Sequence, residues 1–68
     1  MKVYTVMCVI LYEKEILGVY STLKKAYHEV HACFGPHEKI EDEVVTDKCI
    51  EISTNTDAYW IYINTVDE

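Results

Sequence analysis

The sequence predicts one α+β domain spanning residues 1–68, with two β-hairpins flanking a single helix. Three observations support this fold class. A chain of 68 residues is too short for two domains. Its hydrophobic content of 50% is incompatible with intrinsic disorder. Its apolar residues follow strand-like patterns at both ends and helical spacing between them. The expected order is β-β-α-β-β, an antiparallel four-stranded sheet with one helix packed on one face.

The first hairpin is expected over residues 3–20. Residues 3–12 are rich in β-branched, aromatic and other apolar side chains on both faces, which indicates a central strand. Residues 13–15, Glu-Lys-Glu, form a short polar turn. Residues 16–20 then form the second strand, in which Gly18 marks a bulge or a close approach of the backbone.

A helix follows this hairpin. Ser21 or Thr22 provides the N-cap, because a hydroxyl oxygen can accept a hydrogen bond from the first free helical N–H groups. Apolar residues at three-and-four spacing form one stripe: Leu23, Ala26, Tyr27, Val30, Cys33 and Phe34. Gly35 fits the left-handed C′ position, and Pro36 prevents the helix from continuing.

The second hairpin is expected after a polar loop at residues 37–43. Residues 44–52 form the third strand, whose better core face contains Ile50 and Ile52. Residues 53–57 form a turn, and residues 58–64 form the fourth strand. That strand places Tyr59, Ile61 and Ile63 on one face and Trp60, Tyr62 and Asn64 on the other, while residues 65–68 are expected to fray. One helix covers one sheet face, so the other meets solvent, a second copy or a partner.

Charge excludes several functions. Six lysines, no arginine and twelve acids give a formal net charge of −6. Direct binding to nucleic acid or to an anionic membrane surface requires the opposite sign. Residues 3–12 are too short to span a bilayer and lack a signal-peptide cleavage site, and three cysteines do not form a disulfide framework. We therefore expect a cytoplasmic protein with reduced thiols.

The sequence carries no catalytic or metal-binding pattern. The histidines (His28, His31, His37) and Cys33 do not form a CxxC, HxxxH or HExxH arrangement, and zinc requires converging ligands. Cys33 and His37 are the only local nucleophile–base pair, and a cleft that holds a substrate is hard to build in 68 residues. With only two glycines there is no glycine-rich phosphate loop. We expect no enzyme activity, no metal and no cofactor.

The remaining features are acidic and aromatic side chains in the second half of the chain. The predicted partner-binding residues are Glu41, Asp42, Glu43, Asp47, Glu51, Tyr59, Trp60 and Tyr62. The acids either maintain solubility or steer the protein toward a basic partner. The aromatic residues are the expected anchors, although strand parity leaves open which of them face outward.

Residues 2–34 also resemble a local pattern of many small phage and bacterial proteins. The chain begins Lys-Val-Tyr-Thr-Val over residues 2–6, and residues 17–26 read Leu-Gly-Val-Tyr-Ser-Thr-Leu-Lys-Lys-Ala, a GVYS strand end leading into a helix. The resemblance implies an accessory domain of the counter-defence or host-inhibitor type, such as anti-CRISPR proteins. It carries over no catalytic residue.

Together these observations favour a non-enzymatic acidic protein-binding module. The leading hypothesis is a phage-type inhibitor that occludes a basic, nucleic-acid-facing surface of a host defence protein such as a CRISPR-Cas component. If encoded by a phage, it acts in the host cytoplasm. The alternatives are a homodimeric structural domain, paired through sheet faces or edge strands, and a dimer that binds a small ligand in its cleft.

Overall fold

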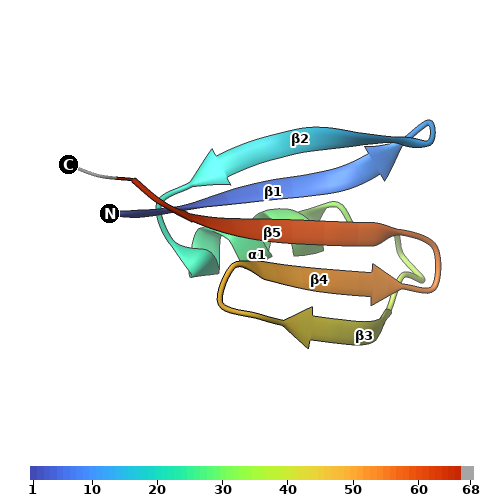
Figure 1. Ribbon diagram of the computed structural model, residues 1–68. Coiled ribbons are helices and arrows are strands. Elements are labelled where there is room, and N and C mark those ends of the chain that lie inside the picture. The colour runs from blue at the N-terminus through green and yellow to red at the C-terminus, as the bar shows by residue number, and fades with distance from the viewer. Residues whose placement is uncertain (67–68) are drawn as a thin grey trace.

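A computed structural model describes residues 1–66, which form five strands and one helix in a single domain. The elements are β1 (Lys2–Ile10), β2 (Glu13–Tyr20), α1 (Leu23–Ala32), β3 (Ile40–Val45), β4 (Cys49–Thr54) and β5 (Ala58–Thr65). All strand pairs are antiparallel, in the order β2-β1-β5-β4-β3 (Figure 1). The α+β class is confirmed, whereas the predicted number of four strands is wrong.

The additional strand arises because the chain reverses within predicted strand 44–52. The hydroxyl oxygen of Thr46 accepts hydrogen bonds from the N–H groups of Lys48 (3.3 Å) and Cys49 (3.0 Å). The Thr46 N–H also donates to the Cys49 carbonyl at 2.9 Å. This threonine-based turn separates β3 from β4 without glycine or proline, the residues that usually mark a turn. Part of predicted loop 37–43 therefore belongs to β3.

The first hairpin also turns at an unexpected place. Its loop is Leu11–Tyr12, not residues 13–15, and both residues have positive φ angles, 53° and 70°. Tight two-residue hairpins of this kind usually contain Asn-Gly, because bulky residues are strained there. The close approach predicted at Gly18 is confirmed, since a Cβ atom there would lie 2.6 Å from the hydroxyl oxygen of Tyr20.

The helix begins as predicted and ends earlier. Thr22 is the N-cap, and its hydroxyl oxygen accepts the N–H of Lys25 at 3.2 Å. The predicted left-handed Gly35 is wrong, because neither glycine has a positive φ angle. Instead, the N–H of Cys33 donates to Val30 and that of Phe34 to His31, each at 3.1 Å, which closes the last turn tightly.

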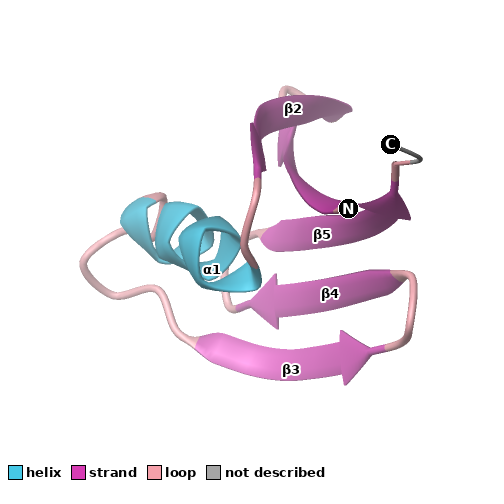
Figure 2. Ribbon diagram, turned by 90° about the vertical axis from the view of Figure 1, so that its left-hand side faces the viewer, coloured by secondary structure: helices cyan, strands magenta, loops and turns pink. Residues whose placement is uncertain are grey.

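Helix α1 packs on one face of the sheet (Figure 2). Ala26 and Val30 of the helix are fully buried against the sheet. The remaining buried hydrophobic residues are Val6, Cys8, Ile50, Ile52, Tyr59 and Ile61. These sheet residues come from β1, β4 and β5, so the core lies under the three inner strands. Of the edge strands, β3 is exposed throughout, whereas Leu17 and Tyr20 of β2 are half-buried against the core.

One carboxylate joins the loop after α1 to the core. Glu38 accepts hydrogen bonds from the Gly35 N–H (2.9 Å), the Thr54 hydroxyl (2.6 Å) and the Tyr59 hydroxyl (3.0 Å). Burial opposes ionisation of Glu38, but these hydrogen bonds outweigh it and lower its pKa. Burial and the same carboxylate raise the pKa of Tyr59.

The chain ends pair with each other. Thr65 is opposite Lys2 in the sheet, and the N–H of Val66 donates to the carbonyl of Met1 at 2.7 Å. Of the segment 65–68 that was expected to fray, residues 65–66 are therefore held, and residues 67–68 lie outside the described residues.

Candidate binding surface

The sheet face opposite α1 is called the helix-free face here, and two rows of cross-strand neighbours define it. One row is Ile16, Met7, Trp60, Glu51 and Val44, and the other is Val19, Thr5, Tyr62 and Cys49. Side chains alternate between the two faces of a sheet, and the residues that alternate with these along β1, β4 and β5 are the ones buried under α1. No described helix covers this face (Figure 2).

The helix-free face is concave between β2 and β5. Lys14 of β2 reaches over β1, and its Nζ lies 4.1 Å from the ring centroid of Trp60. The same Nζ donates a hydrogen bond to the Tyr62 hydroxyl at 2.9 Å. This reach requires the β1–β2 hairpin to curl over the helix-free side, as Figure 2 shows. The two half-buried aromatic rings therefore lie partly beneath a lysine, held by a cation–π contact.

Two predicted acidic residues share this face. Glu51 is exposed and lies between Trp60 and Val44 in the cross-strand row. Asp42 is exposed and pairs with Ser53, two residues from Glu51 on the same face. The structure thus brings four of the eight predicted residues together. We call Asp42, Glu51, Trp60 and Tyr62 the acid–aromatic surface.

Two other predicted residues lie on the helix side. Tyr59 is buried in the core, where its hydroxyl donates to Glu38, so it is not available as an outward anchor. Glu43 accepts a 2.6 Å hydrogen bond from the Tyr27 hydroxyl, which ties β3 to the helix. Burial and this carboxylate raise the pKa of Tyr27 to about 12.

The last two predicted acids lie at the periphery. Glu41 is exposed at the bulge in β3, where the pairing register shifts between Ile40 and Asp42. Asp47 is exposed in the β3–β4 turn. Both add negative charge near the acid–aromatic surface without sharing its side-chain rows.

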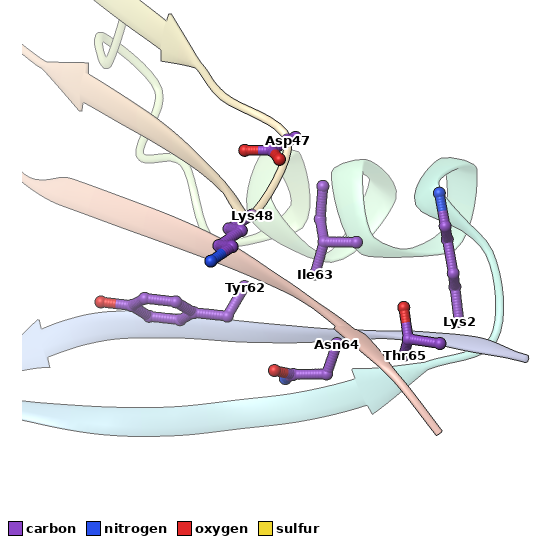
Figure 3. A pocket seen from close by; sticks show the side chains of 7 residues that line it. All are labelled: Lys2, Asp47, Lys48, Tyr62, Ile63, Asn64 and Thr65. Carbon is purple, nitrogen blue, oxygen red and sulfur yellow. The ribbon is translucent and has the colours of Figure 1, made fainter. Parts of the chain in front are cut away.

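A hollow of about 550 Å³ lies where the β3–β4 turn meets the end of β5 (Figure 3). It is lined by Lys2, Asp47, Lys48, Tyr62, Ile63, Asn64 and Thr65. Tyr62 and Ile63 point to opposite faces of the sheet, so the hollow wraps around a sheet end. Its lining contains no cysteine or histidine, and we assign it no chemistry.

The cysteine thiols all have pKa values above the ordinary one. Desolvation by neighbouring groups and the charge of Glu29 raise the pKa of the exposed Cys33 thiol, which disfavours the thiolate. All three cysteines are free. Within residues 1–66, no cluster of three or more His, Cys, Asp or Glu side chains is arranged to hold a metal ion.

Sequence reasoning missed Lys14, which was assigned to a turn. The signal was present, because alternation continued backward from Ile16 places Lys14 on the same strand face.

Comparison with protein-family models, curated proteins and solved structures finds no match to this chain. Within the described residues, no helix has the length and apolarity needed to cross a membrane.

Proposed function

We propose that this protein is a non-enzymatic binding module whose acid–aromatic surface occludes a basic, nucleic-acid-facing surface of a partner protein. The observation that carries the proposal is the placement of Asp42 and Glu51 on the same exposed face as Trp60 and Tyr62. Protein interfaces combine aromatic anchors with a polar rim, and hot-spot residues are enriched in tryptophan and tyrosine.

An uneven distribution of charge supports a basic partner. Residues 38–51 contain six of the twelve acids and two of the six lysines, whereas residues 1–37 contain three acids and four lysines. Segment 38–51 supplies β3 and the start of β4, so the negative charge gathers at one edge of the sheet. The electrostatic field of this acidic edge accelerates association with a basic protein surface. The phosphates of nucleic acid attract such a surface in the same way.

The proposed target is a protein that binds nucleic acid, because its basic surface matches the acidic residues of this chain. A protein surface evolved for phosphates is rich in lysine and arginine, and carboxylates compete for the same groups. The resemblance of residues 2–34 to small phage proteins makes host defence proteins, including CRISPR-Cas components, the proposed targets. The protein would then act as an inhibitor in the host cytoplasm.

The proposal is tested by affinity capture from a bacterial lysate with three baits: the wild type, D42K/E51K and E13K/D57K. Both variants change the formal net charge from −6 to −2, and all four substituted residues are exposed. We expect a partner that wild type and E13K/D57K capture, that D42K/E51K does not, and that duplex DNA displaces. Equal loss with both variants, or capture that survives D42K/E51K, would contradict the proposal.

A further inference from the structure

We propose that β2 pairs antiparallel with β2 of a second copy of this chain, so that two sheets join into one across a two-fold axis. The inference concerns the edge of the sheet opposite to β3 and does not depend on the proposed function. It is carried by the exposed apolar side chains of this edge, its charge pattern and its strained hairpin tip.

The first observation is apolar exposure. Five of the ten large hydrophobic side chains that are exposed in the described residues lie in one ten-residue stretch of the first hairpin: Ile10, Leu11, Tyr12, Ile16 and Val19. Ile16 and Val19 of β2 are 62% and 58% exposed on the helix-free face. Exposed apolar groups that gather on one element mark interaction surfaces.

The second observation identifies the partner as a second copy. When β2 pairs with itself about a centre between Ile16 and Leu17, Glu13 lies opposite Tyr20 and Glu15 lies opposite Gly18. No acid then faces an acid, and the centre of the pairing is apolar. Like charges directly opposite each other in a sheet are destabilising, and this register avoids them.

The same operation on β3 fails. Antiparallel pairing about its middle places Asp42 opposite Glu43, with Glu41 alongside, and all six residues of β3 are exposed. Charged side chains on an edge strand prevent edge-to-edge association. Self-pairing about the strand middle therefore opposes like charges in β3, whereas the charged residues of β2 lie at one end and meet no like charge.

The third observation is the strained tip of the first hairpin. Leu11 and Tyr12 combine positive φ angles with exposures of 88% and 100%, so they are unfavourable both in conformation and in contact with water. In the proposed register, Tyr12 lies opposite Ser21 and Leu11 opposite Thr22 of the second copy, at the start of its helix. Leu11 and Tyr12 would then contact the second copy instead of water.

The pairing register also agrees with the bulge in β2. The partners of Val6 and Met7 are Gly18 and Ile16, which leaves Leu17 as the extra residue. The bulge therefore lies at the proposed two-fold axis. Residues 13–16 of one copy then face residues 17–20 of the other, which contain the bulge and the strand end. The two acid–aromatic surfaces lie toward the outer edges of the joined sheet.

Sedimentation equilibrium tests the proposal, with protein at concentrations up to about 100 μM, where a dimer with a micromolar dissociation constant predominates. The variant I16K/V19K is compared with V44K/V45K on β3, whose residues are similarly exposed at 51% and 64%. We expect the wild type and V44K/V45K to dimerise, and I16K/V19K to dimerise at least about tenfold more weakly. Far-UV circular dichroism confirms that each variant is folded.

Amide hydrogen exchange identifies the mode of association. Exchange of β2 amides should slow as protein concentration rises, whereas exchange in β3 should not change. A wild type that remains monomeric at about 100 μM overturns the proposal. A dimer in which β2 amides exchange as fast as in the monomer, or one that V44K/V45K disrupts as much as I16K/V19K does, also overturns it. D42K/E51K leaves β2 unchanged and should dimerise, so failure of the proposed function is recognised separately.

Discussion

The two edge strands, β2 and β3, occupy equivalent positions in the sheet and differ in chemistry. β3 has three consecutive carboxylates, Glu41, Asp42 and Glu43, and every one of its residues is exposed. β2 exposes Ile16 and Val19 and has one lysine between two glutamates. Both edges contain a register shift, so the difference lies in charge and not in backbone regularity. Our two proposals rest on this difference: the acidic edge is proposed to serve a basic partner and the apolar edge a second copy.

A substitution in β5, the strand that joins the two halves of the sheet, should destabilise both edge strands. Ile61 of β5 is fully buried between β1 and β4. We expect I61A to lower the free energy of unfolding by about 2–4 kcal/mol, because a large buried side chain is lost and a cavity is left. Urea denaturation followed by tryptophan fluorescence measures the change.

Both edges should lose their structure together in this variant. Hydrogen exchange in β2 and in β3 should accelerate by similar factors. If β2 alone became faster, the sheet would not be one cooperative unit, and the two edges could not be compared as parts of a single fold.

A smaller loss of stability is expected when the Glu38 carboxylate, which holds the loop before β3 to β4 and β5, is neutralised. We expect E38Q to cost about 1–3 kcal/mol, because Glu38 accepts charge-assisted hydrogen bonds from Thr54 and Tyr59. Thermal denaturation measures the loss. The matched control is E41Q, which neutralises an exposed carboxylate of β3 and should change stability by less than about 0.5 kcal/mol.

The same carboxylate predicts a dependence on pH. The pKa of Glu38 is lower in the folded protein than in an unfolded chain, so its contribution is present above the ordinary carboxyl pKa. The contribution is lost as the pH falls through the lowered folded pKa. The stability difference between wild type and E38Q should therefore shrink on acidification, and a difference that grew would contradict this assignment.

The hairpin tip offers a stabilising change. Replacing Leu11 and Tyr12 by the favoured turn pair, in L11N/Y12G, should raise stability by about 1 kcal/mol, because positive φ angles suit Asn and Gly. Differential scanning calorimetry checks the increase in Tm. If the tip rests on a second copy, dimerisation should weaken although the fold becomes more stable. A variant that gains both stability and affinity would show that the tip contributes nothing to pairing.

The smallest expected effect concerns Lys14, which links β2 to the aromatic residues of β5. K14M keeps an apolar stem but removes the cation–π contact with Trp60 and the hydrogen bond to Tyr62, at a cost of about 0.5–1 kcal/mol. Acrylamide quenching of Trp60 fluorescence should increase, and K39M, which lies outside this contact, should leave it unchanged. Unchanged quenching in K14M would mean that Lys14 does not cover the ring.

Much of the fold follows from local patterns. The strand alternation around Ile61 is confirmed, and so is Thr22, one of the two predicted N-caps. The helical stripe is confirmed as far as Val30, whereas Cys33 and Phe34 lie beyond the end of α1 and Cys33 is exposed. The two misplaced turns, at Leu11–Tyr12 and Thr46–Lys48, contain neither glycine nor proline. The second turn is closed by local hydrogen bonds of the Thr46 hydroxyl, a weaker signal than glycine or proline. The first turn has no such local signal, because Leu and Tyr are disfavoured at positive φ angles.

The acid–aromatic surface was predictable only in part. Composition identified the acids and aromatic residues, but strand pairing decides which of them share a face. Tyr59 and Trp60 are adjacent in sequence and lie on opposite faces, one in the core and one beneath Lys14. The reach of Lys14 across β1 depends on the curl of the first hairpin, which no local pattern encodes.

An NMR titration of ¹⁵N-labelled protein with an oligoarginine peptide that carries one tryptophan tests whether the acid–aromatic surface binds a basic partner. We expect the signals of the Trp60 indole N–H and of the amides around Asp42 and Glu51 to shift and to saturate, while the amides of β2 do not shift. We also expect D42K/E51K to abolish these shifts and E13K/D57K to retain them. Small, non-saturating shifts spread over all exposed carboxylates, or shifts centred on β2, would contradict the assignment of the acid–aromatic surface as the binding site.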